Sequence, residues 1–492
     1  MGIIERNLFA NICANIIIVL LVLIATPIYV NILGIEKYSL IGIYFTLITI
    51  LGIIDTGITA VISREIAYLT SKSKKNNLIG STFYTFEILY WLILISVGIL
   101  LIFLSIIFWN IFINSNLERQ EVSISIILII LTIIIQLPSN YYIGALMGLQ
   151  KQVLASQINV FFHTLRIISS LILILFTQDL RLFFSTLIIV SLLQTFTSRY
   201  IAWQKLKKYS DEIIFSFKVL HNIKNFALSI IIITGLSVVT SNIDKFYVSK
   251  NFNLEILGYY LLCWSIASGL FRLGIPIMQT FSPHFAELFS LNNYKALSEK
   301  YLLSNKLIFL FIIPISITII MNSELVIYSW TQNVYVASNS VNILQFLVMG
   351  SMFSICAYPA LSLLYSQKKY KKVLIFHIFG FIVSILYYNI FLNDNLYISY
   401  YYVAFYGFIF MLFSHWCSKF INQNINIIKS FFITIFVSVI INFAGNFLFI
   451  SEKYILNILI LLLILIFISI IIIIINKEFK KMIKQFIINF KN

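Results

Sequence analysis

The sequence predicts an all-α polytopic membrane protein with about fourteen transmembrane helices. Of its 492 residues, 60% are hydrophobic and only 11% are charged, and the mean hydropathy is +0.98. Soluble domains carry about 25% charged residues, so this composition excludes that class. The apolar runs reach about 20 residues without strand-length alternation, which indicates helices and not a β-barrel, because a membrane helix satisfies its own backbone hydrogen bonds.

Apolar segments recur along the whole chain and are separated by short polar connections. The expected spans, in order, are 11–32, 40–62, 81–109, 122–148, 152–176, 181–203, 226–248, 256–285, 305–329, 341–366, 372–392, 396–420, 428–450 and 454–476. With the N-terminus inside, 26 basic residues fall on the cytoplasmic side and six on the outer side. Positive charge accumulates in cytoplasmic loops, so both termini are expected in the cytoplasm.

The spans divide into two sets of six and a remaining pair. The longest connection, about 204–225, is basic and too short for a soluble domain. Six is an even number, so both sets enter the membrane in the same direction, as a parallel repeat does. We expect an N-terminal lobe at 1–225, a C-terminal lobe at 226–425, and two further helices with a basic tail at 426–492. The Asp55-Thr-Gly-Ile and Arg272-Leu-Gly-Ile segments occupy matching places in the two lobes, which predicts a polar cavity between them.

Charged side chains inside the spans are the candidate functional residues. An ionised group near the bilayer centre costs about 2.5 to 3.5 kcal/mol, so it normally faces water or a partner. The candidates among the charged residues within or at the mouths of spans are Asp55, Arg64, Glu87, Arg166, Asp244 and Arg272, and Arg166 shares a helical face with Asn159 and His163. Hydrogen bonding between helices is the alternative role for the neutral polar residues of such a face. His163 is either a proton carrier or a core histidine whose hydrogen bonds are satisfied.

Several classes of function are disfavoured. The net charge of +16 follows the membrane sidedness and does not indicate nucleic-acid binding. The four cysteines all lie in apolar spans without paired spacing, which argues against disulfides and zinc. The chain has no P-loop, HExxH or GxSxG motif and no metal-ligand cluster, so we expect neither an enzyme, nor a metal site, nor a cofactor.

Two segments carry a resemblance to a known family. The first, ATPIYVNILGIEKYSLIGIYFTLITILGIIDTGITAVISREIA, contains Pro27, Leu33, Gly34, Tyr38, Gly42, Asp55, Gly57, Arg64 and Glu65. The second, NIDKFYVSKNFNLEILGYY, contains Asp244, Leu257, Gly258 and Tyr259. With the layout of six, six and two spans, the chain resembles the Wzx-type flippases of O-antigen and capsule repeat units, in the polysaccharide exporter superfamily. This family is related to lipid II flippases and to MATE multidrug exporters.

The resemblance implies a substrate, a location and roles for residues. The substrate is a polyprenyl diphosphate carrying an oligosaccharide, moved from the cytoplasmic to the outer leaflet of the bacterial inner membrane by alternating access. Arginine binds phosphate oxygens well, so Arg272 and Arg166 are expected to contact the diphosphate, Arg64 to lie at the cytoplasmic entrance, and Asn159 and His163 to contribute to the substrate site. Asp55, Glu87 and Asp244 are expected to couple transport to H⁺ or Na⁺, or to pair with the arginines.

The remaining alternatives differ in substrate or in class. A lipid II flippase shares the span count, and a cation-coupled MATE-like drug exporter shares the superfamily but usually has twelve spans. A polysaccharide polymerase would more plausibly expose a large outer loop, and here the outer loops are short. Polysaccharide polymerase machinery is an expected partner. A membrane scaffold without transport activity gives no reason for arginines inside the spans.

Overall fold

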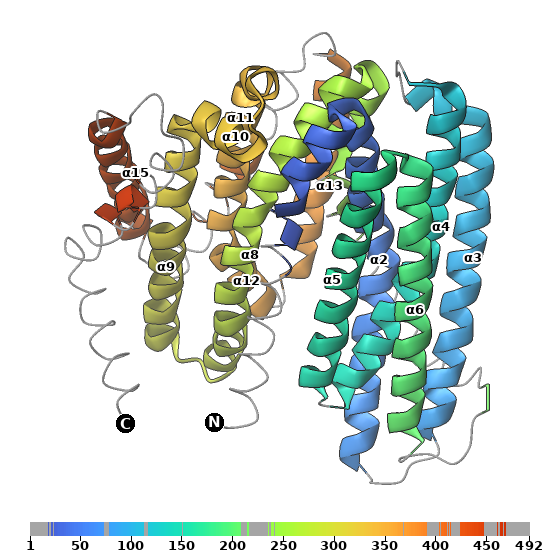
Figure 1. The fold of residues 1–492 in the computed structure, drawn as a ribbon. Coiled ribbons are helices and arrows are strands. Elements are labelled where there is room, and N and C mark those ends of the chain that lie inside the picture. Colours follow the sequence, from blue (N-terminus) through green and yellow to red (C-terminus); the bar gives the residue numbers. More distant parts are fainter. Residues whose placement is uncertain are drawn as a thin grey trace. The chain divides into compact units, whose positions relative to one another are not determined.

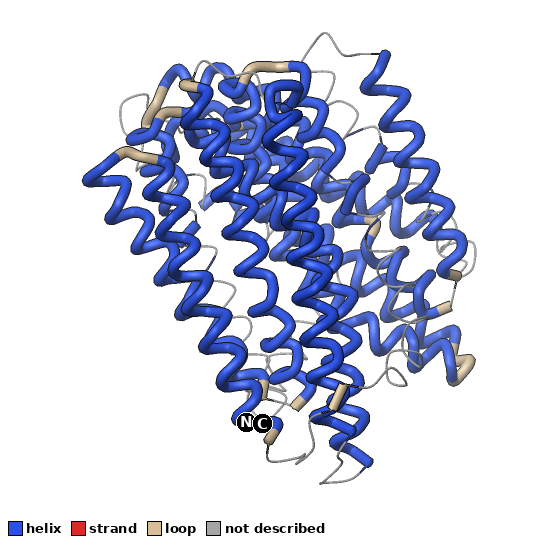
Figure 2. The backbone as a smooth tube through the Cα atoms, turned by 90° about the vertical axis from the view of Figure 1, so that its right-hand side faces the viewer, coloured by secondary structure: helices blue, strands red, loops and turns tan. Residues whose placement is uncertain are grey.

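The computed structural model describes most of the chain. The described residues are 18, 21–22, 24–72, 78–112, 117–149, 151–207, 214–215, 235, 238–240, 242–367, 369–390, 403, 405–410, 412, 414, 424–446, 460, 463–465 and 467–468. Their regular secondary structure is helical (Figures 1 and 2). The main helices are α2 Ile35–Lys72, α3 Leu78–Phe112, α4 Arg119–Gly148, α5 Gln152–Thr177, α6 Leu180–Leu206, α8 Leu254–Ser290, α9 Tyr294–Met321, α10 Ser323–Thr331, α11 Val334–Cys356, α12 Tyr358–Ser366, α13 Tyr370–Ile390 and α15 Asn424–Asn446.

The predicted fold class, an all-α polytopic membrane protein, is confirmed. Within the described residues, eight helical segments are long and apolar enough to cross a membrane, and three shorter apolar helices accompany them. Most of the spans predicted at 226–248, 396–420 and 454–476, and the first half of the span at 11–32, lie outside the described residues.

Several helix boundaries differ from the prediction. α2 continues to Lys72, ten residues beyond the predicted end. Two predicted single spans are each divided: 305–329 forms α9 and α10, and 341–366 forms α11 and α12. Pro359 stands in the first turn of α12, where its missing N–H needs no partner. At the other break, the Asn322 amide donates to the Thr318 carbonyl at 3.0 Å, in the last turn of α9.

The chain forms two compact units, Met1–Leu261 and Leu262–Asn492. In the first, α4 contacts α2, α3, α5 and α6, and 61% of the residues in an apolar 18-residue stretch of α4 are buried, against 17% in such a stretch of α3. In the second, α9 contacts α10, α11, α12 and α15. Thus α4 is the central helix in the described part of the first unit. The domain boundary predicted after residue 225 lies outside the described residues, and the one after 425 falls at the start of α15, so both stay predictions.

The parallel helices α2 and α4 pack closely. An ion pair of 2.8 Å joins Lys37 and Glu121 near their first turns. Near their other ends, a Cβ at Gly148 would stand 2.6 Å from the Ser63 carbonyl oxygen. Glycine is therefore required there because the backbones approach each other directly. The ion pair also places the starts of both helices at one end of the unit, as the alternation of the predicted spans requires.

Gly148→Ala should lower stability, because the new methyl group must push α2 away from α4, at a cost of about 1 to 3 kcal/mol. Gly52 is the matched control on α2, since a Cβ there meets nothing within 4 Å. Gly52→Ala should stabilise the helix by about 0.5 to 1 kcal/mol. Thermal unfolding of both variants in detergent tests the opposite signs, and equal midpoints would contradict the close approach.

Candidate functional site

Arg166 belongs to α5, inside the first unit, and its side chain reaches α6. Its side chain is only 6% exposed. The Nη2 atom donates to Gln194 Oε1 at 2.6 Å and to Ser191 Oγ at 3.5 Å, both on α6. The Nε atom is buried without a hydrogen-bond partner. Among the described residues, no carboxylate forms an ion pair with this guanidinium. A buried cation is thus held by neutral groups alone, an arrangement that is costly until an anion approaches.

Neutral polar residues from the other helices of this unit lie near the same depth. The Tyr44 hydroxyl on α2 donates to Gln136 Oε1 on α4 at 2.5 Å. The Tyr29 and Ser170 hydroxyls are 2.7 Å apart, and Thr195 donates to the Ile135 carbonyl at 2.6 Å. These contacts link α2 to α4, α4 to α6, and the helix at Ile24–Leu33 to α5 through buried side chains. We call this set, with Arg166, the arginine layer.

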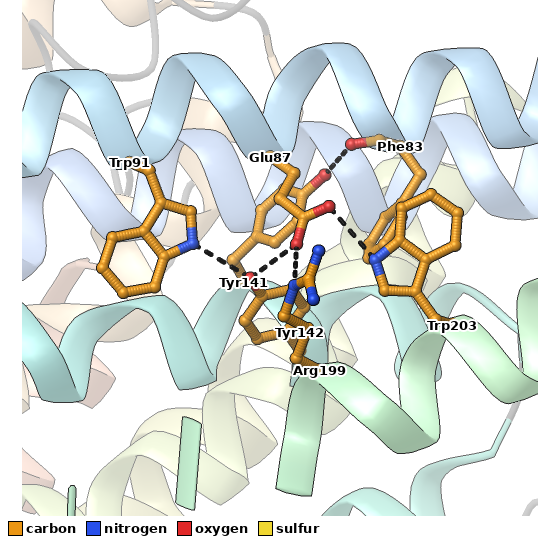
Figure 3. Close-up of polar contacts among 7 residues, drawn as sticks. All are labelled: Phe83, Glu87, Trp91, Tyr141, Tyr142, Arg199 and Trp203. Atoms are coloured by element: carbon orange, nitrogen blue, oxygen red, sulfur yellow. Dashed lines mark hydrogen bonds and ion pairs between the residues drawn. The ribbon is translucent and has the colours of Figure 1, made fainter. Parts of the chain in front are cut away.

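A second polar set surrounds Glu87 on α3, which is 4% exposed. Its Oε1 accepts from Arg199 Nε at 2.6 Å and from the Tyr142 hydroxyl at 2.8 Å. Its Oε2 accepts from the Trp203 indole at 3.1 Å, and Trp91 donates to the Tyr142 oxygen at 3.0 Å. Figure 3 shows the donors from α4 and α6 converging on the carboxylate, while Trp91 of α3 is bound to Tyr142. We call this set the glutamate layer.

Aromatic rings enclose the glutamate layer. Phe83 stacks on Tyr141 with centroids 5.1 Å apart and meets the Trp203 ring edge-on at 4.8 Å. The Tyr141 hydroxyl donates to the Phe83 carbonyl at 2.6 Å (Figure 3). At a rise of about 1.5 Å per residue, Tyr142 and Arg199 lie about 8 Å along α4 and α6 from the arginine layer. The two layers are therefore about one and a half helical turns apart.

The partner of Glu87 differs from the expected one. The sequence suggested a pair with Arg166, Arg272 or Arg64, and the structure places Arg199 there instead. Arg199 lies near the cytoplasmic end of the predicted span 181–203, where a basic side chain is expected to face water. Its side chain is 49% exposed, so it reaches a buried acid while remaining hydrated in part. With three donors already bound, Glu87 is better suited to holding helices together than to releasing and binding a proton.

Asp244 is also neutralised locally. It is 1% exposed, accepts from the Tyr260 hydroxyl at 2.5 Å, and lies 3.6 Å from the Lys245 ammonium. Lys245 is 3% exposed and donates to Asn242 Oδ1 at 3.0 Å. Lys245 is therefore a buried cation whose charge is compensated by the adjacent carboxylate. This cluster lies within the first unit, since all its residues precede Leu262.

Arg272 lies in the second unit, on α8, and its side chain is exposed. It forms no ion pair among the described residues. Of the other expected residues, Asn159 and His163 lie on α5 and are partly exposed. Asp55 and Arg64 lie within α2, but their side chains are outside the described part of the structure.

The structure brings together residues that sequence reasoning missed, namely Gln194, Arg199, Trp203 and Lys245. Gln194, Ser191 and Ser198 do recur at helical spacing on α6, which is a signal for a polar face. Arg199 and Trp203 are four residues apart and share a face, but they lie near the end of the predicted span 181–203, where residues of the membrane interface are expected. Within the described chain, no cluster of His, Cys, Asp or Glu is arranged to hold a metal.

The fold is that of transporters of the MOP superfamily. Residues 226–389, about a third of the chain, match the MatE family. The lipid II flippase MurJ in an inward closed conformation superposes with a TM-score of 0.71 at 16% identity, covering 94% of this chain and 98% of that one. An inward-facing multidrug resistance MATE family transporter gives a TM-score of 0.62 at 15% identity, covering 82% and 96%.

A third similar structure is a MOP superfamily transporter from Pyrococcus furiosus, whose binding pocket is described as having reversed polarity. Its TM-score is 0.60 at 16% identity, with 86% of this chain and 96% of that chain covered. Identities this low show a shared fold and leave the substrate open. No curated protein sequence matches the chain.

The glutamate layer should behave as one coupled unit. Arg199→Gln should destabilise the protein by about 1 to 2 kcal/mol, because it removes the cation from a buried carboxylate while leaving two neutral donors. Glu87→Gln, which removes the charge of the acid, should cost a similar amount. The double variant should cost about 1 kcal/mol less than the sum of the two. Thermal unfolding in detergent measures this cycle, and strict additivity would show that the two side chains are not coupled.

Proposed function

We propose that this protein is a flippase that moves a polyprenyl-diphosphate-linked oligosaccharide, such as an O-antigen or capsule repeat unit, from the cytoplasmic to the outer leaflet. The observation that carries the proposal is the pair of arginines, Arg166 and Arg272, which have no acidic partner in the described part of the chain. Cations kept at membrane depth without counterions are suited to a substrate that brings its own negative charge.

The charge balance favours an anionic substrate over a cationic drug. Glu87 is paired with Arg199, and Asp244 with Lys245. These two buried acids are thus already neutralised, while the two arginines are not. A cationic drug would gain nothing from this arrangement, whereas a diphosphate would gain charge-assisted hydrogen bonds.

The extent of the similarity also favours a flippase. Almost the whole of each MATE structure aligns with this chain, yet 14 to 18% of this chain stays unaligned, against 6% in the comparison with MurJ. A share of 14 to 18% is long enough for two additional spans with their connections. The MurJ comparison makes a lipid II flippase the nearest alternative, and a MATE-like drug exporter the more distant one.

The proposed mechanism is alternating access by the two lobes, with the lipid tail remaining in the bilayer. Arg64 would receive the diphosphate at the cytoplasmic entrance, and Arg166 and Arg272 would hold it during passage. Asn159 and His163 would contact the sugars. Asp55 is the preferred residue for coupling to H⁺ or Na⁺, because the contacts of Glu87 and Asp244 commit both to local pairs. We place the protein in the bacterial inner membrane with both termini cytoplasmic, and polysaccharide polymerase machinery is its proposed partner.

Arg272→Ala should reduce surface polysaccharide by about tenfold or more in the native host, because a charge-assisted contact to the diphosphate is worth about 1.5 to 3 kcal/mol. The variant should still accumulate in the membrane. Arg181→Ala is the control, since Arg181 lies beside Asp179 at the start of α6 with a side chain that is 44% exposed. Near-normal polymer in Arg272→Ala would remove this residue from the mechanism, and efflux of cationic dyes by the wild type would favour the drug-exporter alternative.

Arg166→Met separates structural from functional roles. Replacing a buried charge by an apolar side chain of similar length should leave thermal stability within about 1 kcal/mol of wild type, because the lost hydrogen bonds are offset by the removed desolvation cost. Surface polysaccharide should nevertheless fall. A stable variant with normal polymer would show that Arg166 takes no part in transport. A stable variant without polymer would support contact with the substrate.

A further inference from the structure

Arg272 on α8 lies on an exposed helical face together with two serine side chains. Leu273 and Ile275 beside it are 47% and 40% exposed, so this part of α8 is an uncovered surface of the second unit. Ser265 and Ser268 precede Arg272 by seven and four residues, which places all three on one helical face. Both hydroxyls donate to carbonyls of their own helix, at 2.6 Å and 3.1 Å. Their oxygens keep lone pairs that can accept further hydrogen bonds.

Space is available along one edge of this face. A Cβ built on Gly269 would meet nothing within 4 Å, although Gly269 lies on a helix with buried neighbours on its other side. Gly269 is one residue after Ser268 and three before Arg272, so the open position adjoins both. A ligand group that contacts the guanidinium therefore has room to extend along the helix.

Three aromatic side chains border the same part of the unit. The Trp264 and Phe271 rings on α8 have centroids 6.4 Å apart, and Phe271 and Tyr358, on α12, have centroids 6.2 Å apart. All three side chains are partly exposed. Trp264 and Phe271 are seven residues apart, which aligns them in a row beside the row of Ser265 and Arg272. The aromatic row of Trp264 and Phe271 therefore lies next to the polar row of Ser265 and Arg272.

From this juxtaposition we propose a subsite for a glycosyl phosphate, in which Arg272 binds phosphate oxygens and the rings of Phe271 and Trp264 bind the first sugar. The C–H groups on one face of a pyranose carry partial positive charge, and an aromatic ring presents a negative face to them. The sugar hydroxyls at the ring edge can donate to the serine oxygens. This inference rests on the proposed function and adds to it the residues that recognise the sugar next to the diphosphate.

The subsite discriminates between two anionic lipids. A polyprenyl diphosphate without sugar can use only the arginine, whereas the glycosylated form also covers the rings. Stacking on an aromatic side chain is worth about 0.5 to 1.5 kcal/mol, or about three- to tenfold in affinity. The recognition of the first sugar is thus separable from the recognition of the phosphate.

The test uses the purified full-length protein in detergent and two probes, undecaprenyl diphosphate and undecaprenyl diphosphate carrying one N-acetylglucosamine. Native mass spectrometry or thermophoresis gives both dissociation constants. Wild type should bind the glycosylated probe about three- to tenfold more tightly. In Phe271→Leu and Trp264→Leu this ratio should fall toward one. Arg272→Gln should weaken binding of both probes by about tenfold or more and preserve the ratio.

Two controls keep the result interpretable. Phe271→Tyr retains the ring and should retain the ratio. Phe311→Leu removes a ring that is 47% exposed on α9 in the same unit and should change neither constant. An unchanged ratio in both leucine variants at positions 264 and 271 would overturn the subsite. Equal binding of the two probes by wild type would also overturn the subsite. If both probes bind in a way that depends on Arg272, the proposed function still stands. If wild type prefers neither probe over phosphatidylglycerol, the proposed function fails together with the subsite.

Discussion

The cost of an ionised group in a hydrocarbon environment is the constraint on which this structure depends. The protein meets that cost in two different ways. Acidic side chains inside the first unit are surrounded by donors, as Glu87 is by Arg199, Tyr142 and Trp203. Arg166 and Arg272 have no such acidic partners among the described residues. This asymmetry leaves positive charge available and is the physical basis for assigning an anionic substrate.

The polar layers also explain how the first unit is held together. Lipid tails are as apolar as leucine, so burial of apolar side chains contributes little to helix association in a membrane. Close packing and hydrogen bonds between helices must supply it. The glutamate layer joins α3, α4 and α6, the arginine layer joins α2, α4, α5 and α6, and Gly148 permits direct backbone contact between α2 and α4. A unit connected at several depths is suited to moving as one body.

The two arginines differ in setting, and this suggests different contributions. Arg166 is enclosed by neutral groups and has one unsatisfied donor, so any anion that reaches it must enter a confined polar environment. Arg272 lies on an open helix face beside aromatic rings, where a large head group can be accommodated. A head group made of diphosphate and sugars offers chemistry for both settings, whereas a small inorganic ion would make little use of the rings.

The sequence by itself determined the membrane class and the helical architecture. These follow from composition and from the length of apolar runs, which depend on local transfer energies and not on tertiary contacts. Only the tertiary structure decided which charges meet. Glu87 pairs with Arg199 across 112 positions of sequence, Lys245 is buried against Asp244, and the divisions at Asn322 and Ala357 were not expected. Helical periodicity fixes the face on which a side chain lies, but the neighbouring helix and the relative depth are fixed by packing, which no local pattern encodes.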